Sequence, residues 1–201
     1  MIFIALLALF AQSAHQHHPP RSAAEYAKVL NDPARDGWQK PHEVVMALNL
    51  KPSDVVADIG AGTGYFARRF ALHAAKVYAV DIDAGLLKIA AENAPKNMET
   101  VLSTPDDPKL ADASVDVVFI CNVLHHIENR PAYYAKLAKA LKPGGRLVNI
   151  DFFKKHLPVG PPVEMKLSEE HVVGELAAAG FKKTAAPTFL TYQYFLVFEK
   201  R

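Results

Sequence analysis

The sequence is poor in cysteine and tryptophan, with one residue of each among its 201 positions. The single cysteine, Cys121, excludes an internal disulfide, and no cysteine or histidine spacing typical of a zinc site occurs. The 23 basic residues nearly balance the 21 acidic ones and form no basic block, so charge does not favour nucleic acid as a partner. We therefore expect no metal site. The chain is long enough for one domain with its own hydrophobic core.

Long hydrophobic runs are also missing, except at the N-terminus, where residues 1–11 (MIFIALLALFA) are all apolar. This run is too short to span a bilayer comfortably as a helix, but it matches the core of a secretory signal peptide. Small residues, Ala11 and Ser13, stand before a cleavage point, although no lysine or arginine precedes the run. We expect residues 1–21 to be a signal peptide or a membrane-associating anchor and linker. The protein is then exported (periplasmic or secreted), or else cytoplasmic or membrane-tethered.

The pattern of apolar residues divides the rest of the chain into a helical lid, residues 22–50, and a core, residues 51–201. In the lid we expect helices over 22–31 and from His42, joined by a loop that contains Trp38. In the core, short apolar runs alternate with helices, which predicts a parallel sheet covered on both faces. The expected strands are 55–59, 76–80, 98–103, 115–121 and 146–152, then two antiparallel strands around 185–190 and 192–198. The expected helices are 64–74, 85–93, 131–141 and the segment from Ser168 to Gly180.

A glycine-rich loop follows the first expected strand, at the sheet edge where ligands bind in open folds of this type. The segment DIGAGTG places glycines at Gly60, Gly62 and Gly64, whereas a dinucleotide fingerprint requires its third glycine at position 65, which is Tyr65. Asp58, just before the loop, would disfavour a pyrophosphate and suits a ligand with an ammonium or sulfonium group. The loop therefore argues against NAD.

An aspartate, Asp81, ends the second expected strand, in VYAVDID. An acidic residue at this place can accept hydrogen bonds from both hydroxyls of a ribose. The structural alternative is that the aspartate caps the next helix, but Asp83, two residues on, can take that role. We therefore expect Asp81 to bind a ribose.

Four segments in order and spacing resemble class I S-adenosylmethionine-dependent methyltransferases of the type 11 kind: DIGAGTG, VDID, VDVVFICNVLHHIEN and LKPGGRLVNIDFF. The resemblance covers about residues 41–200. It implies a Rossmann-like three-layer α/β/α sandwich, with a seven-stranded, mostly parallel sheet of order 3-2-1-4-5-7-6 and, before it, the helical extension. It also implies S-adenosylmethionine as the cofactor and methyl transfer to an acceptor, for which we expect a small molecule.

The resemblance assigns the cofactor to residues at four strand ends. Asp106 is the candidate for the adenine amine, because Thr104 and Pro105 occupy the places where many family members have an acid and a small residue. Asp107 is then expected to cap the turn at Pro108. The cofactor-binding residues expected are Asp58, Gly60, Ala61, Gly62, Gly64, Asp81, Ile82, Asp106 and Asn122.

The chemistry of methyl transfer requires alignment of the reacting atoms and exclusion of water, and a base only where the acceptor loses a proton. His125, His126 and Asp151 lie after the fourth and fifth expected strands and are the candidate catalytic residues. The alternative for the histidines is structural, with one packed under the sheet edge and the other capping a helix. Tyr26, Trp38 and Tyr65 are candidates for a lid over the cofactor.

Two other functions remain open from the sequence. One is a non-catalytic exported binding module with the same fold. Loss of the glycine loop or of Asp81 would favour this function, but the sequence retains both. The other is an NAD-dependent oxidoreductase, which Tyr65 and Asp58 disfavour. The acceptor and the oligomeric state are not specified by the sequence.

Overall fold

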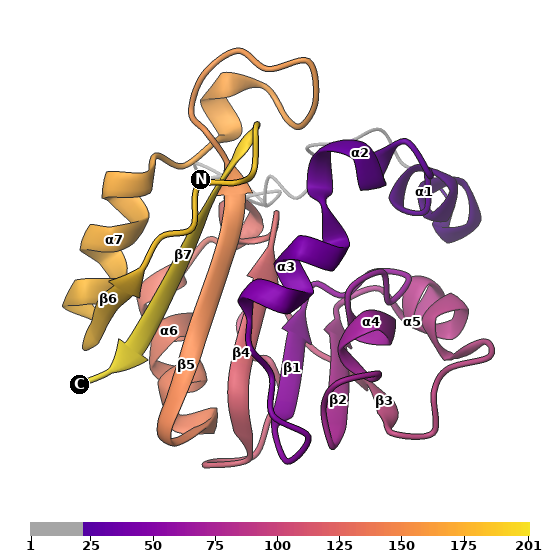
Figure 1. Cartoon of the computed structure of the whole chain (residues 1–201), viewed down its shortest axis with the longest axis horizontal. Coiled ribbons are helices and arrows are strands. Elements are labelled where there is room, and N and C mark those ends of the chain that lie inside the picture. The colour runs from indigo at the N-terminus through magenta and orange to yellow at the C-terminus, as the bar shows by residue number, and fades with distance from the viewer. Residues whose placement is uncertain (1–21) are drawn as a thin grey trace, which may run out of the picture.

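A single seven-stranded sheet forms the centre of the computed structural model, which describes residues 22–201 (Figure 1). The order β3-β2-β1-β4-β5-β7-β6 confirms the predicted fold class. Strands β1 to β5 run parallel, and β7 pairs antiparallel with both β5 and β6. The strands are β1 (Val55–Ile59), β2 (Lys76–Asp81), β3 (Met98–Leu102), β4 (Val115–Cys121), β5 (Leu141–Phe152), β6 (Phe181–Ala185) and β7 (Gln193–Lys200). The expected signal peptide or anchor, residues 1–21, lies outside the described residues.

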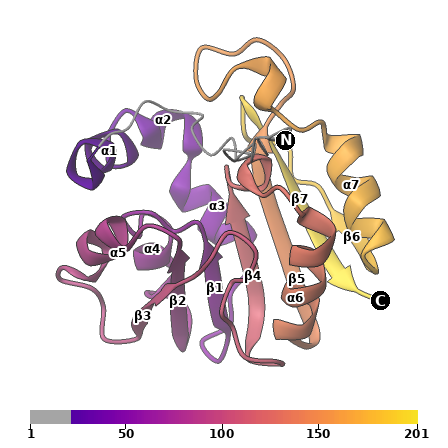
Figure 2. The same cartoon turned by 180° about the vertical axis from the view of Figure 1, so that it is seen from behind.

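Helices cover both faces of the sheet, which explains why its strands are apolar almost throughout (Figures 1 and 2). One core lies between the sheet and α3 (Pro41–Ala47), α4 (Ala67–Phe70) and α5 (Ala84–Ala91), where Phe70 packs against Phe119 of β4. The other lies under α6 (Arg130–Ala140) and α7 (Glu169–Ala178), where Tyr134 and Leu176 are buried. Two short 3-10 turns complete the chain: η1 (Leu124–His126) and η2 (Val163–Met165).

Two further helices, α1 (Ala23–Leu30) and α2 (Arg35–Gln39), lie beyond the carboxyl ends of the strands (Figure 1). α1 begins with a capping box, in which Ser22 and Glu25 satisfy each other's backbone amides. The loop expected over these residues is wrong, because Arg35–Gln39 form the short helix α2. The side chain of Asp32 accepts a hydrogen bond from the Ala34 amide at the start of this turn, and Lys40, in a left-handed conformation, ends it.

Three other boundaries differ from the expected ones. α4 is limited to four residues, because the chain turns from Ala71 onward instead of continuing the predicted helix to residue 74. The sixth strand begins directly after Gly180, earlier than the predicted 185–190, because Phe181 is buried against α7 and pairs with the end of β7. β5 includes the two glycines at 144 and 145, which form a bulge where its register against β4 shifts.

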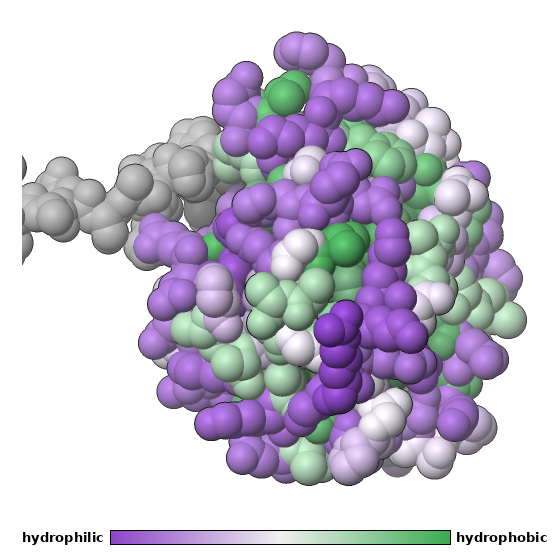
Figure 3. Space-filling view, turned by 90° about the vertical axis from the view of Figure 1, so that its left-hand side faces the viewer, coloured by the Kyte–Doolittle hydropathy of each residue, from purple (hydrophilic) through white to green (hydrophobic). Residues whose placement is uncertain are grey.

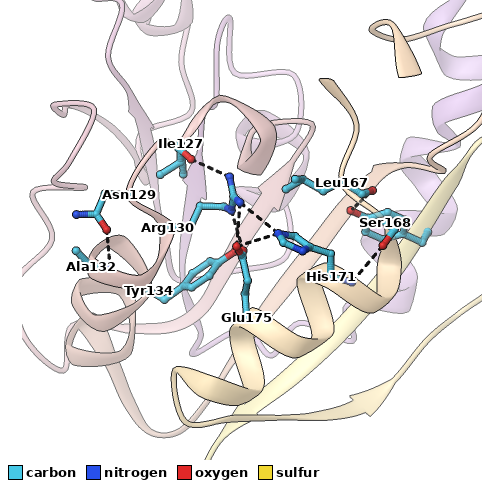
Figure 4. A network of polar contacts seen from close by, with 10 residues as sticks. Ile127, Asn129, Arg130, Ala132, Tyr134, Leu167, Ser168, His171 and Glu175 are labelled. Atoms are coloured by element: carbon cyan, nitrogen blue, oxygen red, sulfur yellow. Dashed lines mark hydrogen bonds and ion pairs between the residues drawn. The ribbon is translucent and has the colours of Figure 1, made fainter. Parts of the chain in front are cut away.

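A polar network joins α6 to α7 (Figure 4). The Arg130 guanidinium donates two hydrogen bonds to the carboxylate of Glu175, at 2.7 and 2.8 Å, and the hydroxyl of Tyr134 donates a third. Arg130 also donates to the carbonyl oxygen of Ile127, directly after η1. Such a bidentate pair fixes geometry as well as adding energy, so it holds the loop that carries the two histidines.

The surface of the described residues carries few large apolar side chains. On the face shown in Figure 3, hydrophilic side chains predominate and apolar ones are scattered among them. No helix within residues 22–201 combines the length and hydrophobicity needed to cross a membrane. The large hydrophobic residues that are exposed are Val29, Met46, Leu72, Ile82 and Leu102.

Candidate active site

The glycine loop is fixed by hydrogen bonds within the protein. The amides of Gly60 and Ala61 both donate to the carbonyl oxygen of Val80, at 2.8 and 3.0 Å. The amide of Gly62 donates to a carboxylate oxygen of Asp81 at 2.7 Å, and that of Gly64 to the Ala61 carbonyl oxygen. The amides of Gly60, Ala61, Gly62 and Gly64 are therefore already paired, and three of these bonds attach the turn to the end of β2.

We expect Gly60→Ala to destabilise the protein by roughly 2–4 kcal/mol, through left-handed strain and a steric clash together. Gly60 has φ +70°, and a Cβ there would lie 2.2 Å from a methyl group of Val123. Gly144→Ala is a matched control, because Gly144 has φ +76° but nothing within 4 Å of its Cβ position. It should lose only about 1 kcal/mol. Denaturant unfolding of both variants gives the comparison, and equal losses would contradict a role for close packing against Val123.

Asp58, near the end of β1 and directly before the glycine loop, is buried, with 3% of its surface exposed. Burial raises the pKa of its carboxyl group to about 8, although a hydrogen bond from the Ala67 backbone and the charge of Arg35 oppose the change. The nearby carboxylate of Asp81 raises it further. A cationic ligand at this position would stabilise the ionised form, since an opposite charge nearby favours it.

Asp81 and Asp83 have different roles, and the expected role of Asp83 as a helix cap is confirmed. Asp83 caps α5 by accepting hydrogen bonds from the amides of Gly85 and Leu86. Asp81 accepts from the Gly62 amide on one oxygen and from the Asp83 amide on the other. Each carboxylate oxygen retains a second lone pair, so both can still accept a ribose hydroxyl.

Ile82 is exposed beside Asp81, and Leu102, the residue opposite Asp81 on β3, is exposed as well. Their exposed fractions are 60% and 56%, so both side chains are accessible to a ligand held by Asp81. The predicted adenine contact, Asp106, lies in the following turn and is exposed, with the Thr104 hydroxyl bonded to it. Asp107 caps that turn through the Lys109 amide.

Asn122, the first residue after β4, has a left-handed backbone (φ 62°) and belongs to a chain of hydrogen-bonded amide side chains. Gln39 of α2 donates to Gln193 of β7 at 2.7 Å, and Gln193 donates to the Asn122 side chain at 2.6 Å. The chain connects the lid to the strand end where the cofactor residue was predicted. Sequence reasoning missed Gln39 and Gln193, because they are far apart in the sequence and neither belongs to a motif.

His125 and Asp151, two predicted catalytic residues, meet at the ends of β4 and β5. Nδ1 of His125 lies 3.0 Å from a carboxylate oxygen of Asp151, and the two side chains are 3% and 0% exposed. The other oxygen of Asp151 accepts from the Phe152 amide. His126 is exposed, with its ring centroid 4.1 Å from that of His125. The pair Asp151–His125 has the arrangement of an oriented general base, with Nε2 as the basic nitrogen.

Lys166 is a third residue that sequence reasoning missed. It follows η2, is only 2% exposed, and donates to the carbonyl oxygen of Lys155 at 2.9 Å. Desolvation lowers the pKa of its ammonium group, and the charge of Asp151 acts in the opposite direction. A lone lysine between Met165 and Leu167 offers no sequence signal for burial, since lysine is rarely found buried.

Two of the three predicted lid residues lie where helix α2 contacts the core. Trp38 of α2 contacts Phe152 at the end of β5, with ring centroids 5.6 Å apart. Tyr65 is flanked by the guanidinium groups of Arg35 and Arg69, and its hydroxyl donates to Asp36 of α2. Tyr26 lies on α1. The lid thus contacts both Tyr65, which follows the glycine loop, and Phe152, which follows Asp151 on β5.

Sheet order, glycine loop and acidic strand ends together are those of the Rossmann-like methyltransferase class. Residues 57–149 match the family model described as a methyltransferase domain. A solved S-adenosylmethionine-dependent methyltransferase from Aquifex aeolicus superposes with a TM-score of 0.82 at 26% identity, covering 89% of this chain and 98% of that one. The chain thus contains a methyltransferase domain with the fold of the class I S-adenosylmethionine-dependent enzymes.

Two curated relatives match over shorter stretches. Demethylmenaquinone methyltransferase of Tropheryma whipplei (strain Twist) is 32% identical over 72% of this chain and 60% of its own length. Phosphoethanolamine N-methyltransferase 1 of Arabidopsis thaliana is 30% identical over 64% of this chain and 26% of its own length. The chain thus spans less than two thirds of each of these relatives.

Proposed function

We propose that the protein transfers a methyl group from S-adenosylmethionine to a small-molecule acceptor that gives up a proton to His125. The observation that carries this proposal is the convergence at one sheet edge of a buried acid, Asp58, a clamped glycine loop and the Asp151–His125 pair. The relatives' names support a small acceptor, since one refers to phosphoethanolamine and the other to demethylmenaquinone.

The electrostatics of the loop support this cofactor over a dinucleotide. A pyrophosphate needs unpaired amides at a helix N-terminus, whereas the amides of Gly60, Ala61 and Gly62 are bonded to the Val80 carbonyl and to Asp81. Two buried carboxyl groups beside them favour a cationic ligand. Neither the NAD-dependent oxidoreductase nor the non-catalytic binding module has support from the comparisons.

Different residues of the chain bind the cofactor, exclude water and accept the proton during methyl transfer. S-adenosylmethionine, when bound, supplies a methyl group activated by a positive sulfur. Asp58, the glycine loop, Asp81 and Ile82 would hold it, and Trp38 with its helix would shield the site from water. Asp151 holds Nδ1 of His125, so that Nε2 faces the acceptor and takes its proton.

Calorimetric titration of residues 19–201 with S-adenosylmethionine, S-adenosylhomocysteine and NAD tests the cofactor assignment. We expect the first two to bind and NAD not to bind. Asp81→Ala should weaken binding about 10- to 100-fold, because charged hydrogen bonds are lost and the Gly62 amide is released. Asp112→Ala is the matched control, because Asp112 is exposed and lies before β4, at the opposite edge of the sheet. Well-folded protein that binds neither sulfur compound would overturn the proposal.

The apolar N-terminal run supports a second, separate proposal, that the protein is exported or membrane-tethered through residues 1–21. Fractionation of the tagged full-length chain, followed by N-terminal sequencing, tests it. A start after residue 14 in the exported fraction is expected for a cleaved signal peptide. An intact Met1 in the soluble cytosolic fraction would contradict export and tethering alike.

A further inference from the structure

Lys166 is 2% exposed and has no carboxylate within 4 Å among residues 22–201, although the charges of Asp151 and Glu164 act on its ammonium group from farther away. Ion pairs within 4 Å occur at ten places in residues 22–201, and none of them includes Lys166. Its one hydrogen bond goes to the Lys155 carbonyl oxygen, which leaves two of its three N–H donors for other acceptors. Burying an unpaired charge is costly, and a neutral side chain could close the same loop. The cost indicates a role for the charge itself.

The residues around Lys166 indicate which kind of ligand group its ammonium could bind. Its Nζ lies 5.8 Å from the centre of the Phe152 ring, and Phe152 in turn contacts Trp38. Asp151 precedes Phe152 on β5 and holds His125. A proton acceptor, a buried positive charge and two aromatic rings thus gather around the last two residues of one strand.

We propose that Lys166 binds the acceptor oxygen of a flat phenolic substrate and stabilises its phenolate form. This inference rests on the proposed function and specifies the substrate class of the same site. The Phe152 ring is covered by Trp38, with ring centroids 5.6 Å apart, and by Gly160, so entry of a substrate ring beside Phe152 requires α2 and Trp38 to move. Low exposure strengthens the attraction between ammonium and phenolate.

The proposed methyl transfer to the phenol accounts for each proton and electron pair through His125, Lys166 and the sulfur of the methyl donor. The phenol proton passes to Nε2 of His125, and the resulting oxygen anion is held by the Lys166 ammonium. A lone pair of that oxygen forms the new bond to the methyl carbon while the carbon–sulfur bond breaks and its electron pair returns to sulfur. The product is a methyl ether, and His125 returns its proton to water. Once the oxygen is neutral, its attraction to Lys166 weakens and the product can leave.

The test uses 4-nitrophenol, whose phenolate has its own visible absorption band, with protein saturated in S-adenosylhomocysteine. The acid dissociation constant of the bound phenol is measured by absorbance against pH. In the wild type we expect dissociation to be at least about tenfold stronger than in free solution, because an opposite charge lies within contact distance. Lys166→Met should abolish the enhancement and Lys166→Arg should retain most of it. Lys154→Met is the matched control, because Lys154 is exposed on the same loop.

The outcomes separate this inference from the proposed function. Failure of the wild type to bind S-adenosylhomocysteine overturns the proposed function and the inference with it. Binding of that compound without binding of 4-nitrophenol overturns the phenolic substrate class alone. Bound phenol whose dissociation is unchanged in Lys166→Met also overturns the inference, and a fall in thermal stability of that variant would then assign Lys166 a purely structural role.

Discussion

Asp151→Asn is expected to lower the rate of methyl transfer by about 10²–10⁴-fold while leaving cofactor binding within about threefold of the wild type. The carboxylate of Asp151 accepts from Nδ1 of His125 at 3.0 Å, which leaves Nε2 as the basic nitrogen. An amide in its place can donate to Nδ1 and so favour the tautomer whose Nε2 already carries a proton. His125→Gln should lose as much, and the double variant little more, because the two residues act as one unit.

Single-turnover formation of S-adenosylhomocysteine, with catechol as acceptor, gives the rate, and nitrogen NMR of the His125 ring reports its tautomer. His73→Gln is the matched control, since His73 is exposed at the opposite edge of the sheet. His126→Gln distinguishes the two neighbouring histidines. A rate loss confined to His126→Gln, with Asp151→Asn near the wild type, would show that the base is His126 and contradict the role given to the buried pair.

The architecture was predictable because it depends on local patterns that recur along the chain. Apolar runs of strand length between helical segments predict a covered parallel sheet, and DIGAGTG fixes where the ligand edge lies. The strand order came from family resemblance, and the structure confirms it. Element ends were less predictable, as at α2, because Asp32 and Lys40 determine them through single hydrogen bonds and dihedral angles.

The site was predictable only where its residues belong to motifs. His125 and Asp151 were singled out because each follows a strand, and parallel strands bring their carboxyl ends together. That they bond to each other depends on side-chain orientation, which spacing does not encode. The burial of Lys166 and the pairing of Gln39 with Gln193 depend on the path of the loop after β5 and on the docking of α2. Both are consequences of tertiary packing and leave no periodic signal.

Asp58→Asn is expected to remove the fall in stability that ionisation of Asp58 causes in the cofactor-free protein as pH rises. In the wild type the pKa of the Asp58 carboxyl group rises from 3.8 to about 8 through burial. Between these values the folded protein holds a proton that the unfolded chain has lost, so stability falls as pH rises from about 4 to 8. Asparagine has no proton to lose, and the variant should be the more stable protein at pH 9, by a few kcal/mol. Denaturant unfolding at a series of pH values gives the slope.

Asp58→Asn should also weaken cofactor binding. The buried carboxylate of Asp58 destabilises the empty site when it is ionised, but it attracts a cationic ligand. The ammonium and sulfonium groups of S-adenosylmethionine favour ionised Asp58, so binding below pH 8 must expel its proton. We expect affinity to rise up to about tenfold per pH unit as pH approaches 8. Calorimetry in two buffers of different ionisation enthalpy counts the proton, which the wild type should release at pH 7 and Asp58→Asn should not. Binding without proton release in the wild type would show that Asp58 is already ionised, and that burial does not govern its charge.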